Sequence, residues 1–176
     1  VAWFYDEGTL YINGTGGMTT TAPWKNYKSE IKTVVIGSGV TTIGDNAFFG
    51  CTSLESIEIP NSVTTIGKTA FWCCRSLTTV TIGDSVTTIG SSAFYDCTKL
   101  ASIKVVGANT KYSSEDGVLF NANKTELICY PAGKEVNYEV LKNIIDTTDS
   151  KELLKVIKER MEELVPKHIT NEDIIA

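Results

Sequence analysis

Hydrophobic and polar positions recur every 23 residues along the first part of the chain. Residues 31–54, 54–77 and 77–100 are three copies that follow one another without a gap. Eight positions are apolar in all three copies, and mostly Thr, Ser, Asp, Lys and Glu lie between them. In the second copy the apolar positions are Ile57, Ile59, Val63, Ile66, Ala70, Phe71, Cys74 and Leu77. A fixed period of this length predicts stacked, nearly identical structural units.

Each copy predicts two short strands and a turn. Apolar and polar residues alternate over residues 55–59, which predicts a half-buried strand. Residues 63–66 form a second extended piece, and we expect Gly67 to lie at a sharp bend with a positive φ angle. The Ala-Phe-x-x-Cys segment that follows is expected to form a short helical turn that directs Phe71 and Cys74 inward.

A single coil of this kind cannot fold alone. Burying its own apolar side chains does not offset the backbone entropy that is lost when the whole coil is ordered. Neighbouring coils must therefore cover one another's faces, as they do in other solenoids. The strands of successive coils are then expected to form parallel sheets with a spacing of about 4.8 Å.

The signature L-x-x-I-x-I-P-x-x-V-T-x-I-G-x-x-A-F-x-x-C is most complete in residues 54–74. It resembles the BspA-like, or Treponema-type, leucine-rich repeats of bacterial surface proteins. The resemblance is close over residues 31–100 and extends to both flanks. It implies an extracellular or cell-surface protein of adhesion or interaction, without a shared chemistry.

The segment before the repeats predicts an N-terminal cap over residues 1–30. Residues 3–5 and 9–12 are expected to pair as a β-hairpin around a turn at residues 6–8. Residues 23–27 can start a short helix, with Pro near its first turn. Because the first coil of a solenoid needs a cover, this aromatic-rich segment is the expected cap.

The repeat is degraded beyond Leu100. Residues 109–117 replace the Val-Thr-Thr-Ile-Gly segment, and a hairpin is expected to follow them. We expect this hairpin to pair residues 118–120 with residues 126–131 around residues 121–124. The repeat domain is therefore assigned to residues 31–136, with an irregular last coil.

Residues 137–176 have a different composition, in which Lys, Glu, Leu and Ile replace Gly and Thr. One apolar stripe at helical spacing consists of Leu153, Leu154, Ile157, Met161 and Leu164. This tail is interpreted in three ways: it caps the last coil, begins a further domain, or self-associates with another chain. The expected fold is thus α+β and β-rich: a leucine-rich-repeat-like, right-handed solenoid of 23-residue coils with an N-terminal β-hairpin cap and a C-terminal helical tail.

Composition and charge exclude several classes of function. A net charge of −5 and a pI near 4.9 argue against nucleic-acid binding, which requires a basic surface. No run of apolar residues is long enough to span a membrane. We find no signal peptide, and the chain opens on Val1 without Met, as a trimmed fragment of a larger secreted protein would.

Three of the five cysteines follow the period. Cys51, Cys74 and Cys97 are expected to form an inward ladder of buried free thiols, with disulfides between successive coils as the alternative. Cys73 departs from the pattern and is expected to point outward, where it would be either a reactive thiol or a group that forms crystal contacts. Cys129 stands alone. The spacing of these residues does not match a metal site.

The sequence does not predict catalysis. The one histidine, His168, lies in the tail, where we expect an exposed loop residue. The carboxylates are scattered along the repeats, and no phosphate-binding loop is recognisable. We therefore expect no enzymatic activity, no cofactor and no metal ion.

Two surface ladders remain as candidate binding sites. The first is the outward side of the main strand, represented by Glu58, Thr79, Thr81 and Lys104. The second is one aromatic residue per coil, namely Phe49, Trp72 and Tyr95; aromatic side chains are frequent anchors at interfaces and sugar sites. The alternatives are a solvated sheet face for the first ladder and partial burial against the next coil for the second.

The sequence thus favours a non-enzymatic module that binds a protein or glycan and belongs to a bacterial cell-surface or secreted protein. The expected partner is an unidentified host or bacterial surface protein or glycan, and the tail offers possible self-association. The alternative is a structural spacer or targeting domain of a larger secreted enzyme or toxin.

Overall fold

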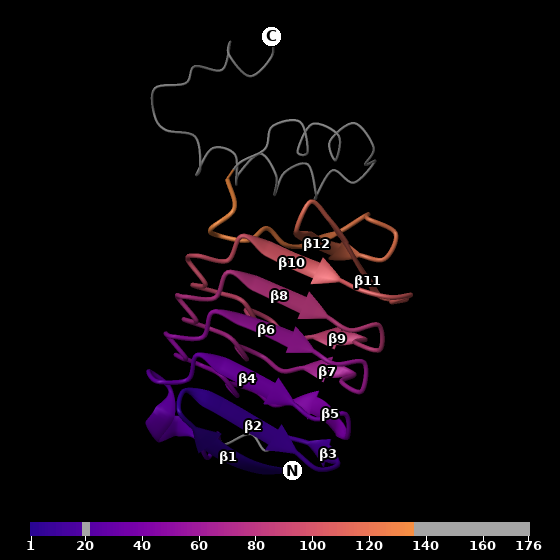
Figure 1. Ribbon diagram of the computed structural model, residues 1–176. Coiled ribbons are helices and arrows are strands. Elements are labelled where there is room, and N and C mark those ends of the chain that lie inside the picture. Colours follow the sequence, from indigo (N-terminus) through magenta and orange to yellow (C-terminus); the bar gives the residue numbers. More distant parts are fainter. Residues whose placement is uncertain (19–21, 136–176) are drawn as a thin grey trace, which may run out of the picture. The chain divides into compact units, whose positions relative to one another are not determined.

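The computed structural model describes residues 1–18 and 22–135. Over these residues the chain winds into stacked coils, and successive coils contribute strands to two rows (Figure 1). The first row holds β1 (Ala2–Asp6), β2 (Thr9–Asn13), β4 (Thr33–Ile36), β6 (Ser56–Ile59), β8 (Thr79–Ile82) and β10 (Ser102–Val105). The second row holds β3 (Gly16–Gly17), β5 (Val40–Ile43), β7 (Thr65–Ile66) and β9 (Thr88–Ile89).

The pairing register follows the sequence period. In the first row, Thr79 of β8 pairs in parallel with Ser56 of β6 and with Ser102 of β10, residues that are 23 positions away on either side. In the second row, Thr65 pairs with Thr42 and Thr88 in the same way. The predicted β-solenoid with 23-residue coils is therefore confirmed.

The described residues contain no α-helix. The expected helical turns are instead hydrogen-bonded turns, in which the amide of Cys74 donates to the carbonyl of Phe71 at 3.1 Å. A short 3-10 helix, η1 (Lys25–Tyr27), occupies the place of the helix expected at residues 23–27. The predicted helical tail, residues 137–176, lies outside the described residues, which form strands, turns and one short 3-10 helix.

The core consists of the repeated apolar positions. Of the eight positions in each of the three copies, all are buried except Ile36 and Ile89, which are partly buried. The phenylalanine of each coil stacks on that of the next: the ring centroids of Phe48 and Phe71 are 5.3 Å apart, and those of Phe71 and Phe94 are 5.6 Å apart. We call these three residues the inner phenylalanine file.

The repeated glycine does not have the expected backbone conformation. Gly67 and Gly90 do not have positive φ angles. A Cβ atom at Gly67 would lie 2.5 Å from the backbone nitrogen of Asp45 in the preceding coil, so the close approach of two backbones requires glycine here. Positive φ angles occur later in each turn, for example 53° at Thr69 and 60° at Cys73.

The N-terminal segment forms the predicted hairpin and also the first coil. Strands β1 and β2 pair antiparallel, and β2 pairs in parallel with β4. The indole nitrogen of Trp24 donates to the carbonyl of Ala47 at 2.8 Å, and its ring stacks on Phe48. In the next coil the carbonyl of Ala70 accepts instead from the backbone amide of Phe48. A side chain thus replaces the backbone donor at this end of the repeats, where the equivalent amide, that of Lys25, donates to the carbonyl of Ala22.

Side chains also terminate the repeats at the degraded coil. The backbone amide of Ile89 donates to the hydroxyl of Tyr112 at 3.0 Å, and the amide nitrogen of Asn109 donates to the carbonyls of Gly83 and Val86. The chain then forms β11 (Tyr112–Glu115), β12 (Val118–Asn121) and β13 (Leu127–Cys129), which pair antiparallel in that order. The β12–β13 hairpin was predicted; β11 was not.

Candidate binding surfaces

The turns of three successive coils hold the predicted ladder of exposed aromatic residues. Phe49, Trp72 and Tyr95 each follow a residue of the inner phenylalanine file by one position, so they lie on the opposite side of the same turn. Phe49 is 38% exposed, Tyr95 is 62% exposed and Trp72 is partly buried. The structure therefore places these three residues together at the surface, and we call them the aromatic stripe.

The rings of the aromatic stripe meet edge to face. The ring centroids of Phe49 and Trp72 are 6.0 Å apart at an interplanar angle of 70°, and those of Trp72 and Tyr95 are 5.3 Å apart at 75°. Lys28 extends the row, because its Nζ atom lies 4.9 Å from the centroid of Phe49. Such contacts hold the rings in defined orientations. Tyr95 is left as the most exposed member.

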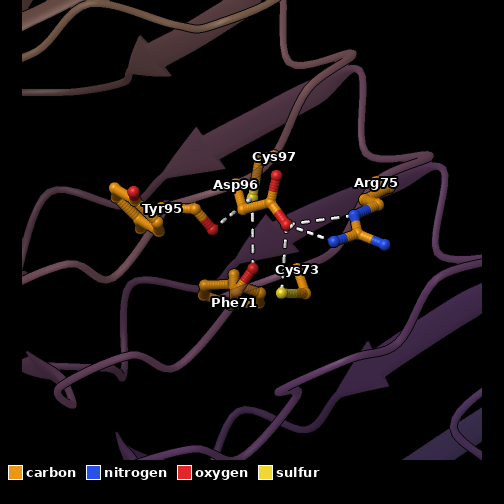
Figure 2. A network of polar contacts seen from close by, with 6 residues as sticks. All are labelled: Phe71, Cys73, Arg75, Tyr95, Asp96 and Cys97. Atoms are coloured by element: carbon orange, nitrogen blue, oxygen red, sulfur yellow. Dashed lines mark hydrogen bonds and ion pairs between the residues drawn. The ribbon is translucent and has the colours of Figure 1, made fainter.

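A polar network lies beside the Tyr95 end of the stripe (Figure 2). The Oδ2 atom of Asp96 accepts from Nε and Nη2 of Arg75, at 3.0 and 2.6 Å, and from the thiol of Cys73 at 3.2 Å. The hydrogen bonds from Arg75 lower the pKa of the Asp96 carboxyl group. The carboxylate is therefore held in place by two side chains of the preceding coil.

Cys73 differs from the sequence-based expectation. Its side chain is partly buried and donates to Asp96, and its backbone is in the left-handed region. Burial, followed by the hydrogen bond and the negative charge of Asp96, raises the pKa of the thiol. Because only the thiolate is nucleophilic, this environment disfavours the reactive thiol predicted for Cys73.

The cysteines of the inward ladder are buried free thiols, as predicted. The thiol of Cys97 donates to the carbonyl of Phe71 at 3.1 Å (Figure 2), and that of Cys74 donates equivalently to Phe48. Burial raises the pKa of Cys51 and of Cys97 to about 12. All three thiols are packing groups, and those of Cys74 and Cys97 also satisfy backbone carbonyls of the preceding coil.

The structure also brings together the residues of the first predicted ladder, which lies on the outward side of the main strand. Glu58, Thr81 and Lys104 are register partners on β6, β8 and β10, and Thr79 lies two residues before Thr81 on β8. Glu58 and Lys104 are exposed, whereas the two threonines are partly buried. We call these four residues the sheet face. They lie on strands, while the aromatic stripe lies on turns, so the two predicted ladders are separate surfaces.

Sequence reasoning missed three residues that lie beside the aromatic stripe, namely Lys28, Arg75 and Asp96. Lys28 precedes the first regular copy, so the period gave no reason to align it with Phe49. The ion pair between Arg75 and Asp96 joins residues 21 positions apart, which differs from the period. The sequence held one signal for this ion pair. Cys73 occupies the position of Asp96 one coil earlier, and it lies two residues before Arg75.

Residues 1–18 and 22–135 contain no cluster of three or more His, Cys, Asp or Glu side chains that could hold a metal ion. A search of the same residues also finds no helix that could cross a membrane. His168 lies outside the described residues.

Comparison with solved structures finds bacterial repeat proteins. A leucine-rich repeat protein from Eubacterium ventriosum is 28% identical, with 75% of this chain and 48% of that chain covered and a TM-score of 0.45. The pneumococcal vaccine antigen PcpA is 32% identical, with 60% and 32% covered and a TM-score of 0.46. A leucine-rich repeat protein of T. pallidum is 39% identical, with 43% and 35% covered and a TM-score of 0.42. The chain thus spans less than half of each of these solved chains.

One curated protein is similar over a short stretch. The DNA-directed RNA polymerase subunit beta of Alkaliphilus metalliredigens is 50% identical over 44 residues, which are 24% of this chain and 4% of that protein. Because the match covers so small a share of the polymerase subunit, it gives no information about the activity of this chain.

The family comparison covers more than half of the chain. The family described as BspA type Leucine rich repeat region (6 copies) matches residues 25–145, which include all three regular copies and the degraded coil. Together with the 23-residue register of the strands, this match shows that the chain belongs to the BspA-type leucine-rich repeat family.

Proposed function

We propose that this chain is a non-catalytic binding module of a bacterial cell-surface or secreted protein, and that the aromatic stripe is its recognition surface. The observation that carries the proposal is a continuous row of large aromatic rings at the surface, which ends in a Tyr95 side chain that is 62% exposed. Aromatic side chains with defined orientations anchor partners at low cost in conformational entropy. The BspA-type repeats support a role in adhesion or interaction.

The sheet face is the weaker candidate. Its two threonines are partly buried, and its two charged residues have opposite signs and lie on the two strands that flank β8. A small, mixed-charge surface of this kind is typical of a solvated sheet face. The aromatic stripe exposes more apolar area, and exposed apolar area is what distinguishes a docking surface from an ordinary one.

The proposal is tested by screening the chain on arrays of glycans and of extracellular proteins, and repeating the screen with matched variants. Trp72→Ala and Tyr95→Ala change the aromatic stripe, while the double variant Thr79→Ala, Thr81→Ala changes the sheet face. We expect the stripe variants to lose the signals that the parent chain gives, without a change in circular dichroism, and the sheet-face variant to keep them. Signals that survive both stripe variants would contradict the proposal.

A further inference from the structure

The three turns that hold the aromatic stripe, together with the segment that precedes the first copy, differ in charge from the rest of the chain. We call residues 22–30, 44–54, 67–77 and 90–100 the turn face. It contains five cationic and three acidic side chains, a net charge of +2 in a chain whose net charge is −5. The cations are Lys25, Lys28, Lys68, Arg75 and Lys99, and the acids are Glu30, Asp45 and Asp96. Positive charge is thus concentrated where the exposed rings lie.

The three acids already have partners within the protein. Asp96 accepts from Arg75 and Cys73, and Oδ1 of Asp45 accepts from the backbone amide of Lys68 at 2.7 Å. Glu30 accepts from the hydroxyl of Tyr5 at 3.4 Å. The acids are therefore partly occupied by local contacts.

The lysines of the turn face are less engaged. Lys25, Lys68 and Lys99 are exposed, and none of them forms an ion pair with a described residue. Lys68 lies four residues before Trp72, and Lys99 lies four residues after Tyr95. Free ammonium groups thus flank the aromatic stripe along the chain.

The geometry of the rings distinguishes between two kinds of acidic partner. Successive rings of the stripe are 70° and 75° apart, so they do not form a flat platform on which successive units of an extended glycan could stack side by side. The ammonium group of Lys28 also lies over Phe49. Single apolar side chains fit against edge-to-face rings, because each one needs only one ring face or edge.

We propose that the turn face binds an acidic segment of another polypeptide, in which apolar side chains contact Trp72 and Tyr95 and carboxylates pair with Lys68 and Lys99. The proposal rests on the proposed function and names the class of its partner. Complementary charge steers such a segment to the surface and sets its specificity, while the rings provide the apolar contact. A polyanionic glycan is the competing occupant that the experiment separates.

The test uses a short fluorescein-labelled peptide in which Asp and Glu alternate with Leu and Phe, with fluorescence anisotropy as the measurement. Two control peptides replace the acids with Lys or the apolar residues with Ser. A heparin oligosaccharide serves as the polyanionic glycan. We expect the acidic, apolar peptide to bind most tightly, and its affinity to fall by about tenfold or more when NaCl is raised from about 50 to about 500 mM.

Variants locate the site. Lys68→Glu with Lys99→Glu, and separately Tyr95→Ala, are each expected to weaken peptide binding by about tenfold. The double variant Thr79→Ala, Thr81→Ala is the control and should bind as the parent does. Circular dichroism confirms that each variant is folded.

Three outcomes would overturn the inference: equal affinity for the acidic and the lysine-containing peptide, full binding by the charge-reversed variant, or binding of heparin without binding of the peptide. After any of these outcomes, the proposed function still holds if Trp72→Ala abolishes the array signals. If the array signals are instead indifferent to Trp72, the proposed function fails as well.

Discussion

Two files of aromatic rings run along the same turns, one residue apart in sequence, yet they have different surroundings. The inner phenylalanine file is buried, and its rings are nearly parallel, with interplanar angles of 15° and 8°. The aromatic stripe is exposed, and its rings are nearly perpendicular. Two sets of aromatic residues with the same 23-residue spacing therefore have different roles, one in the core and one at the surface. Packing between coils constrains the inner file to one residue type, whereas the outer file varies as Phe, Trp and Tyr.

The largest expected difference between the files is in stability. Phe48→Ala removes a fully buried ring that stacks on both Trp24 and Phe71, and should lower the free energy of unfolding by about 3–5 kcal/mol. Phe49→Ala, its neighbour in sequence, removes an exposed ring and should cost about 1 kcal/mol or less. Urea unfolding measures both. Similar losses in the two variants would remove the distinction between the files.

Trp24 stacks on the first ring of the inner phenylalanine file and also acts as a hydrogen-bond donor. Trp24→Phe keeps an aromatic ring against Phe48 but leaves the buried carbonyl of Ala47 without its donor, which should cost about 1–3 kcal/mol. The control is Trp3→Phe, which changes a partly buried ring that contacts Trp24 edge-on. An unchanged free energy of unfolding in Trp24→Phe would show that the indole is not a structural cap.

Alkaline pH should affect the thiols that line the inner side of the turns. Burial raises the pKa of Cys97 to about 12, whereas a thiol in the unfolded chain titrates near about 8.5. The buried, protonated thiol therefore contributes fully below pH ~8.5, and its contribution is lost as pH rises toward 12, at about 1.4 kcal/mol per pH unit.

This loss is tested by comparing the parent chain with Cys97→Ala in urea unfolding between pH 8 and pH 11. The free energy of unfolding of the parent should fall more steeply with pH than that of the variant. Thr98→Ala, an exposed neighbour, should keep the steep dependence. Equal slopes in the parent and in Cys97→Ala would argue that the thiol is not isolated from solvent.

The smallest change in stability is expected at the exposed end of the stripe. Tyr95→Ala removes a side chain that has one ring contact within the part of the chain that the structure describes, with Trp72, and should change the free energy of unfolding by about 0.5–1 kcal/mol or less. The measurement is again urea unfolding. A loss as large as that of Phe48→Ala would assign Tyr95 to the core.

The core and the strand register could be predicted because the same physical constraint acts on every coil. A strand such as β8 must face the core with alternate residues and pair with an equivalent strand on each side, so the period of the sequence becomes the register of the sheet. Positions such as Phe71 and Cys74 are buried for this reason.

Features that depend on three-dimensional proximity between coils could not be predicted. The need for glycine at Gly67 comes from the backbone of Asp45 in another coil, not from a local bend. The caps at Trp24 and Tyr112 lie 23 residues from their partners, so they keep the period. They replace backbone groups with side chains of a different residue type, which the repeat pattern did not indicate. The sequence identified the members of the aromatic stripe. It did not give the edge-to-face geometry of their rings, on which the choice between classes of binding partner depends.

The most direct test of the division between the two files uses adjacent residues and two measurements on the same samples. Phe71→Leu should lower the urea midpoint while the folded protein still binds the acidic peptide. Trp72→Ala should keep the free energy of unfolding within about 1 kcal/mol of that of the parent and lose peptide binding. If both variants lose stability and binding together, the aromatic stripe is part of the core and the account is contradicted.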